Sequence, residues 1–301
     1  MKTFAFFISL LFLTNLQVIG QVGVMYQMQG KGNGMLGLGT QLQNASSFHL
    51  GKERLETIPI YREVNLHRTV LEGTYGITEK LDLQFALPYH VHYGLSSTTL
   101  RQDLELKNRE QGLQDITLQA RYLFLEENTN SGRVQGFGAM GFAAAIGNYQ
   151  VTENLQSLLA IGNRAKRFHG NFTVLYHSDE HFFGRLHSGY TYSSGPVPAH
   201  VETFLGIGVD HKDIFVEAYF QDLHSLNGPD VFGEGFSGAF PFSNIGFQRV
   251  GIEIFKPIGS GVGMSLAGFQ TLGGRNTFRS TGVSLGIAYL FGRDQPKYNH
   301  Y

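Results

Sequence analysis

The chain contains no cysteine and no tryptophan among its 301 residues. The missing cysteine excludes disulfides, thiolate metal sites and lipid-modified cysteine. Charged residues make up only 16% of the chain and the formal net charge is −1, so the basic surface that nucleic-acid binding requires is absent. Together with 39 glycines and 13% aromatic residues, this low charge is untypical of a soluble globular protein.

Long apolar runs are also missing, except at the N-terminus. Residues 1–20, MKTFAFFISLLFLTNLQVIG, combine Lys2, an apolar stretch from Phe4 to Leu13 and a small residue, Gly20. A basic start, a short apolar core and a small-residue end are typical of a secretory signal peptide. The apolar stretch is shorter than the ~20 residues that a membrane-spanning helix needs. We therefore predict a cleaved signal peptide over 1–20 and a mature protein that works outside the cytoplasm.

The rest of the chain shows the two-residue alternation of β-strands. In LDLQFALPYHVHYG, for example, Leu81, Leu83 and Phe85 alternate with Asp82 and Gln84, which places apolar side chains on one face and polar ones on the other. The same periodicity predicts twelve strands, near residues 34–48, 64–77, 80–94, 112–125, 132–147, 166–178, 182–194, 199–210, 213–224, 245–256, 260–273 and 279–291.

The connections between these strands differ in length in a regular way. Short gaps are predicted at 78–79, 126–131, 179–181, 211–212 and 257–259, and long ones at 49–63, 95–111, 148–165 and 225–244, although 195–198 and 274–278 are also short. Short turns on one side and longer loops on the other are typical of an outer-membrane barrel.

The chemistry of the two strand faces favours the same fold. One face is apolar and the other mixes glycine, hydroxyl, amide and charged residues, the inverse of a soluble sandwich, which keeps its apolar face inside. Closure of the sheet satisfies every edge hydrogen bond within lipid. We predict an all-β, transmembrane antiparallel β-barrel over 34–291 in the cell outer membrane, with a periplasmic segment at 21–33 and a periplasmic tail at 292–301. A soluble β-sandwich or periplasmic β-protein is the alternative.

The last predicted strand carries an assembly feature. In STGVSLGIAYLF, the order Ser284, Gly286, Tyr289 and Phe291 resembles the terminal β-signal that the barrel-assembly machinery recognises in outer-membrane proteins. The plainer interpretation is that any strand of such a barrel would look alike. The predicted partners are accordingly this machinery and outer-membrane lipids, and no nucleic acid.

Two stretches carry a family resemblance. YGITEKLDLQFALPYH (75–90) and GLQDITLQARYLF (112–124) combine a hairpin turn around Thr78, a strand with Pro88-Tyr89, and an acidic residue, Asp115, opening the next strand. This order resembles outer-membrane proteins labelled as the MetA pathway of phenol degradation, and QGKGNGMLGLG (29–39) and LGGRNT (272–277) look like further segments of that group. The resemblance implies a barrel similar to fatty-acid-transporter-like channels for hydrophobic compounds.

Three motifs suggest other chemistry. GFGAMG (136–141) matches a dinucleotide-binding pattern, but the residues that follow continue a strand rather than a helix. YHSDEHFF (176–183) brings together Ser, His, Asp and Glu, as a hydrolase or metal site would, yet as sequence neighbours in a turn they are expected to be solvated. His90 and His92 share a strand face and are weak metal candidates. We expect no enzyme activity, no cofactor and no metal.

The inward strand face carries a mixed set of polar residues, for which solute passage and structural bracing are both open roles. The set comprises Arg68, Glu72, Asp82, Gln84, Gln119, Arg121, His169, Arg185, His187, Glu202, Glu217 and Glu253. Acids and bases occur together, so no strong ion filter is expected. We predict a porin-like channel or transporter for small, possibly hydrophobic or aromatic, solutes. The alternatives are a structural or adhesive barrel that acts through its extracellular loops, and a barrel enzyme of lipid metabolism.

Overall fold

The computed structural model describes residues 27–211 and 214–292. Both the predicted signal peptide and most of the predicted C-terminal tail lie outside these residues. The described chain is all-β apart from three short helices, α1 (Thr98–Asp103), η2 (Leu155–Leu159) and η3 (Phe240–Phe242). Its long strands are β1 (Gly34–Leu50), β3 (Glu63–Thr78), β4 (Leu81–Leu95), β6 (Asp115–Thr129), β7 (Gly132–Ala145), β8 (Arg167–Ser178), β9 (Phe182–Ser193), β10 (His200–His211), β11 (Ile214–Ser225), β12 (Gly246–Gly259), β13 (Val262–Arg275) and β14 (Thr277–Phe291).

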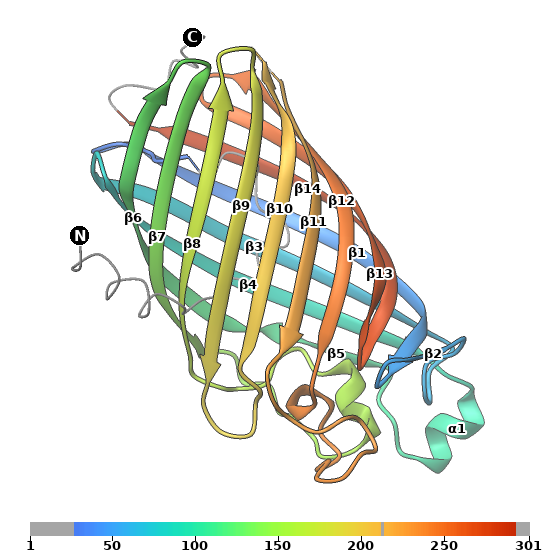
Figure 1. Ribbon diagram of the computed structural model, residues 1–301. Coiled ribbons are helices and arrows are strands. Elements are labelled where there is room, and N and C mark those ends of the chain that lie inside the picture. The colour runs from blue at the N-terminus through green and yellow to red at the C-terminus, as the bar shows by residue number, and fades with distance from the viewer. Residues whose placement is uncertain (1–26, 212–213, 293–301) are drawn as a thin grey trace, which may run out of the picture.

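These twelve strands form one closed antiparallel barrel (Figure 1). Each pairs with its neighbours in chain order, and β14 closes the sheet by pairing with β1 from Gly34 opposite Phe291 to His49 opposite Thr277. Two short strands, β2 (Glu53–Leu55) and β5 (Arg109–Leu113), add to β1 and β4. The predicted fold class and strand number are confirmed. Within the described residues, no helix is long and apolar enough to cross a membrane.

Three predicted boundaries were wrong. The β12–β13 turn lies at Ser260-Gly261 instead of 257–259, and the φ angles of 51° and 78° are those of a type I′ hairpin, the turn that matches strand twist. The segment 126–131 is mostly strand, because β6 continues to Thr129. The single strand predicted at 112–125 is divided after Leu113, since β5 pairs with β4 alone while β6 also pairs with β7.

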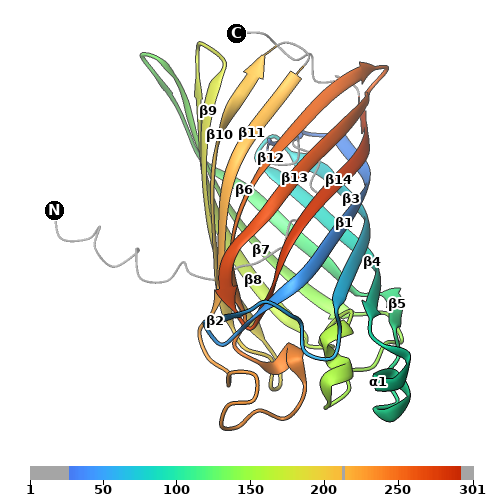
Figure 2. The same cartoon turned by 90° about the vertical axis from the view of Figure 1, so that its right-hand side faces the viewer.

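The two ends of the barrel differ (Figure 2). At one end, here called the turn end, the chain reverses within two or three residues, as at Glu79-Lys80, Asn130-Ser131 and 179–181. The other end, here called the loop end, carries the segments 51–62, 96–114, 146–166, 194–199 and 226–245, together with the tight turn at Asn276. In outer-membrane barrels the short turns are periplasmic, which gives the orientation that we expect.

Alternation along the strands separates two environments. On β4, Asp82 is completely buried while the next residue, Leu83, is 48% exposed. The outward positions of β1 and β14 are likewise large and apolar, with Leu38 and Leu285 at 50% and 56% exposure. An apolar belt around the whole wall is far larger than the patches of soluble proteins, and it fits a barrel whose outer surface contacts lipid.

Candidate functional site: the barrel lumen

All twelve polar residues predicted to face inward lie on the inner face of the wall. Seven of them, Glu72, Asp82, Gln119, Arg121, His169, Glu202 and Glu217, are buried, and the other five, Arg68, Gln84, Arg185, His187 and Glu253, are half-buried on the same strand faces. Whether a given residue serves solute passage or bracing stays a prediction.

Several of these residues brace the wall through buried ion pairs. Asp82 of β4 accepts a 2.7 Å hydrogen bond from Arg121 of the neighbouring β6. Arg185 of β9 donates two hydrogen bonds to Glu217 of β11, at 3.0 and 2.6 Å, across the intervening β10. The crossing requires Gly206 on β10, because a Cβ there would lie 2.1 Å from Glu217 Oε1. Buried charges need such partners, so these pairs have a structural role in any case.

Amides and hydroxyls continue this bracing around the wall. Gln119 donates to Gln84 at 2.9 Å, and Thr173 and His187 share a 2.9 Å hydrogen bond. His169 of β8 extends over Gly141 of β7, where a Cβ would lie 2.1 Å from its Nε2. Inward glycines therefore give long side chains the room to reach over a strand.

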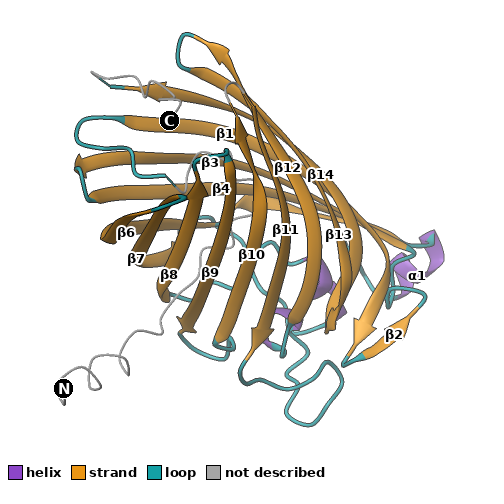
Figure 3. Ribbon diagram, turned by 45° about the horizontal axis from the view of Figure 1, so that its top comes forward, coloured by secondary structure: helices purple, strands orange, loops and turns teal. Residues whose placement is uncertain are grey.

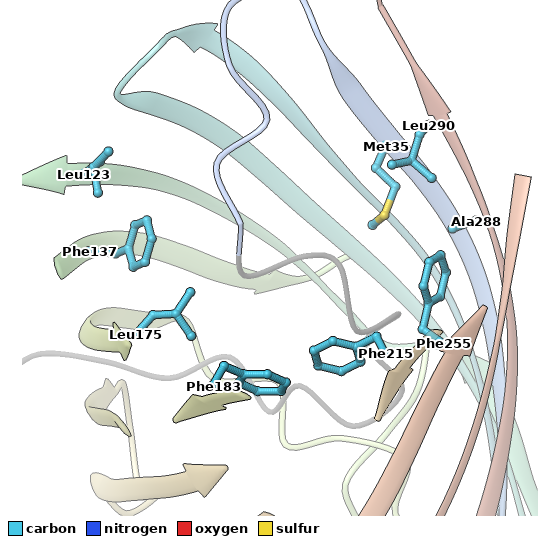
Figure 4. Close-up of a cluster of buried hydrophobic side chains, with 9 residues drawn as sticks. All are labelled: Met35, Leu123, Phe137, Leu175, Phe183, Phe215, Phe255, Ala288 and Leu290. Atoms are coloured by element: carbon cyan, nitrogen blue, oxygen red, sulfur yellow. The ribbon is translucent and has the colours of Figure 1, made fainter. Parts of the chain in front are cut away.

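An apolar ring lines the lumen at the turn end. Figure 4 shows its nine inward side chains, which come from eight strands. In this ring Phe183 and Phe215 stack with their centroids 4.8 Å apart. The turn-end ring consists of Met35, Leu123, Phe137, Leu175, Phe183, Phe215, Phe255, Ala288 and Leu290.

The chain before β1 enters the lumen beside this ring. Met28 packs against the ring, and the carbonyl of Gln27 accepts a 2.6 Å hydrogen bond from Arg121. The Gln27 side chain donates to Asp210 of β10, at 3.4 Å, so the segment reaches across the lumen. Residues 21–33 were predicted to be a periplasmic segment. Its described part, 27–33, contacts the inner wall at the turn end, and the periplasmic location stays a prediction.

At the loop end, a second apolar cluster joins the barrel rim to three loops. Its members are Ala45, Phe48, Ile58, Tyr61, Val64, Leu158 and Leu159. Phe240 of η3 packs at its edge and lies 5.6 Å from Phe48, centroid to centroid. Burial raises the pKa of Tyr61 to about 12, so this phenol stays neutral in the cluster. Helices η2 and η3 lie together inside the loop end, as Figure 3 shows.

The loops 51–62, 146–166 and 226–245, which meet at this cluster, are here called the cap. Two groups of polar contacts, here called the polar anchors, hold the cap in place. In the first, Asp115 at the start of β6 accepts hydrogen bonds from the Tyr149 hydroxyl and, at 2.7 Å, from Arg167. This fixes the loop 146–166 to the wall. In the second, Asp230 accepts hydrogen bonds from Arg275 at 2.7 and 2.6 Å and from Asn276 at 2.8 Å.

Asn276 connects three parts of the loop end. It is fully buried in the β13–β14 turn at φ 45°. Its side-chain oxygen accepts from the backbone of Gly51 and Val231, and its amide donates to the carbonyl of Asn244. In the sequence, LGGRNT contributed only to a family resemblance. No local pattern indicated that Asn276 would connect the loops.

The motifs with alternative chemistry take ordinary structural places. GFGAMG lies within β7. Its Gly136 packs against the ring of Phe124, and a Cβ at this position would lie only 2.9 Å from that ring. In YHSDEHFF, Ser178 accepts from the backbone of Phe182 and the ring of His181 packs on His211. These contacts give a strand and a turn rather than a nucleotide site or a catalytic triad.

The weak metal candidates lie together in the lumen. The rings of His90 and His92 are 5.3 Å apart, and His92 Nδ1 lies 3.1 Å from the carbonyl oxygen of Leu159. Across residues 27–211 and 214–292, no group of three or more His, Cys, Asp or Glu side chains is placed to hold a metal.

The residues of the expected assembly signal occupy both faces of β14. Gly286 is buried on the inner face, while Tyr289 is half exposed on the outer face and stacks on Phe291 at 6.2 Å. This places an aromatic pair at the turn end of the outer wall. The role of Ser284, Gly286, Tyr289 and Phe291 in assembly stays a prediction.

These features define the class of the protein. A closed antiparallel barrel with an apolar outer belt and a polar, partly charged interior is an outer-membrane β-barrel, located in the cell outer membrane.

Comparison with solved structures finds this architecture in the COG4313 outer membrane channel from Pseudomonas putida F1. The two share 14% identity and a TM-score of 0.70, over 88% of this chain and 98% of that chain. The predicted resemblance is thereby confirmed for the fold. Lower similarity is found to the translocator domain of the autotransporter NalP from Neisseria meningitidis (TM-score 0.45, 9% identity, 88% and 91% coverage) and to the CymD monoaromatic hydrocarbon channel (0.39, 11%, 90% and 90%). No protein-family model and no curated protein matches the chain.

Proposed function

We propose that the barrel is a channel or transporter that passes small apolar or aromatic solutes across the outer membrane. The observation that carries this proposal is the turn-end ring. In a water-filled porin the inward positions are polar, whereas here nine inward side chains from eight strands are apolar. A lumen lined in this way suits solutes that lose little by leaving water.

Aromatic side chains elsewhere in the lumen support the same solute class. Phe204 and Tyr219 stack at 5.1 Å on the inner face of β10 and β11, and Arg185 lies 4.1 Å from the Phe204 ring. The solved structure with the same fold is described as an outer membrane channel, which is consistent with passage through this barrel.

Uptake in cells tests the proposal. Cells whose own hydrophobic channels have been deleted would be given radiolabelled toluene at low concentration, with and without this protein. We expect faster uptake with the protein, and faster uptake still with Phe183→Ala/Phe215→Ala, which widens the ring. Leu186→Ala, on the outer face of β9, is the matched control. Uptake equal to that of cells without the protein, for both wild type and the widened variant, would overturn the proposal.

A structural or adhesive barrel is the second candidate. It is favoured by the ion pairs Asp82–Arg121 and Arg185–Glu217, which join nearby strands along the inner wall, and by the polar anchors that hold the loops. No toluene uptake through the barrel, together with saturable binding of its loop end to cells, would favour this candidate over the channel. A lipid-metabolising activity finds no support in the contacts of Ser178 and His181, and the absence of enzyme activity stays an expectation.

A further inference from the structure

We infer that the wall of β10–β13, below the loop-end cap, holds a binding site for a small planar solute that carries one hydroxyl group. The inference deepens the proposed function, on which it rests, by naming a solute class and the residues that select it. Its polar part is Glu202, Gln221 and Arg249, and its apolar part is Tyr219, Phe247 and Phe269.

Arg249 is the central observation. Its side chain is buried on the inner face of β12, and its guanidinium lies 4.7 Å from the ring of Phe247 and 4.1 Å from that of Phe269. Its Nε–H has no hydrogen-bond partner in the part of the chain that the structure describes. A guanidinium has only donors and remains charged, so leaving one of them buried and unpaired is costly. The arrangement calls for an acceptor that enters from the lumen.

Glu202, on β10 two strands away from Arg249, has an acceptor atom that lacks a donor. Its Oε1 accepts a 3.1 Å hydrogen bond from Gln221, which pairs in register with Arg249. Its Oε2 is buried without a hydrogen-bond partner in the described residues, although carboxylate oxygens are strong acceptors. Gln221 on β11 therefore lies between an unsatisfied donor, Arg249 on β12, and an unsatisfied acceptor, Glu202 on β10.

A hydroxyl group satisfies both atoms at once. It accepts a hydrogen bond from Arg249 and donates one to Glu202, whereas a carboxylate has nothing to donate and an ammonium cannot accept. The polar part of the site therefore matches a neutral amphoteric group better than an ion of either sign.

Aromatic rings beside this group give the solute its apolar part. The ring of Phe269 lies over Gly282, where a Cβ would be 2.3 Å away, and that of Tyr219 lies over Gly251, where it would be 2.4 Å away. Glycine at both positions lets the rings lie against the wall. There Phe269 packs on Arg249 and Tyr219 stacks on Phe204, so an aromatic solute meets the edges of these rings, an arrangement that aromatic pairs favour.

Equilibrium dialysis of the purified full-length protein in detergent tests the site, with benzyl alcohol, toluene, benzoate and benzylamine as probes. Arg249→Met fills the space between the two rings but removes the donors. We expect it to weaken benzyl alcohol binding roughly tenfold, since one hydrogen bond to a charged group is lost, and to change toluene binding by less than about twofold. Arg133→Met, at an exposed turn-end position, should leave both affinities unchanged.

A second variant covers the case in which Arg249→Met does not fold. Glu202→Gln has nearly the same shape and should weaken benzyl alcohol binding about threefold, because a neutral acceptor is weaker than a charged one. Equal benzyl alcohol affinity in wild type and in the folded variant or variants would overturn the site. Tighter binding of benzoate or benzylamine than of benzyl alcohol would overturn the solute class.

The outcomes separate the site from the proposed function. Toluene uptake without selective benzyl alcohol binding would remove this site and leave the channel in place. Selective binding without uptake of either compound would remove the channel and leave a binding barrel.

Discussion

The turn end and the loop end of the lumen both bury apolar side chains, but they are built in different ways. The turn-end ring consists entirely of inward strand positions, so the alternation of the strands and the closure of the sheet are enough to assemble it. The loop-end cluster instead joins the rim of β1 and β3 to residues such as Ile58 and Leu158, which lie on separate loops. Polar anchors hold those loops: Asp115 holds one and Asn276 connects others.

This difference suggests separate roles for the two ends. A ring made by the wall keeps its shape as long as the barrel exists, and only residues 27–30 can leave it without breaking strand pairing. A cap made by loops can open only when its anchors give way. We therefore expect any adjustment of the lumen at the loop end to require release of its anchors, and any adjustment at the turn end to involve the segment before β1.

The largest expected difference between the two ends is all-or-none accessibility from outside the cell. The chain has no cysteine, so a single one can be introduced and labelled with a membrane-impermeant maleimide. Glu234→Cys, at the loop end, should react on intact cells, and Asn130→Cys, in the β6–β7 turn, should react only after permeabilisation. Labelling of Asn130→Cys on intact cells would reverse the orientation.

Removing a polar anchor should have the largest effect on stability. Asp115→Ala leaves the half-buried Arg167 without its carboxylate and the Tyr149 hydroxyl without its acceptor. Breaking a fully buried ion pair costs about 3–5 kcal/mol, and we expect a loss near the lower end of that range because Arg167 is partly exposed. Urea unfolding of the protein in detergent measures the loss. The control is Glu126→Ala, whose pair with Arg133 is exposed on both sides and should contribute less than about 1 kcal/mol. Equal losses in both variants would show that the anchor adds nothing special.

The features built by the strands could be predicted from the sequence, and those built by contacts between distant residues could not. The strands and their inward faces were predictable because alternation is a local signal, and residues such as Arg121 and Glu217 lie where it places them. The pairs they form were not, because Arg185 reaches Glu217 only across the inward Gly206 of a third strand. Asn276 and Tyr149 were also missed, because Asn276 bonds to distant loops and Tyr149 to Asp115, 34 residues before it.

The contacts of the segment before β1 could not be predicted from the sequence. Residues 27–33 show no strand or helix periodicity, so nothing in them indicated contact with the lumen. Their position depends on Gly76 of β3, where a Cβ would lie 1.9 Å from the carbonyl oxygen of Gly30. In the sequence, Gly76 contributed only to a hairpin resemblance. The space that a side chain would fill at Gly76 is occupied by the backbone of Gly30.

A valine at this glycine should therefore release the segment while leaving the barrel intact. Gly76→Val displaces Gly30 and with it the contacts of Gln27 and Gln29, whereas Asp82 and Arg121 remain paired with each other. We expect a stability loss of about 1–3 kcal/mol, as for other overpacked sites, and a larger single-channel current in planar bilayers. Gly184→Val is the matched control, because a Cβ there meets nothing within 4 Å. An unchanged current would mean that the segment does not narrow the turn end.

The smallest expected effect is the response of the loop end to acid. Hydrogen bonds from Arg275 hold the pKa of Asp230 below its usual value of 3.8. A carboxyl group with a lowered pKa in the folded protein stabilises it above the usual pKa, and this stabilisation is lost as the pH falls through the lowered one. The effect is small because both partners are about one-third exposed. A spin label on Glu234→Cys should be equally immobile from pH 7 to 4 and become mobile only as the pH falls through the lowered pKa of Asp230. Adding Asp230→Asn should make the label mobile at every pH, because the charged acceptor of Arg275 is gone. A label that is as immobile in the Asp230→Asn variant as in wild type at pH 7 would remove Asp230 from the anchors of the cap.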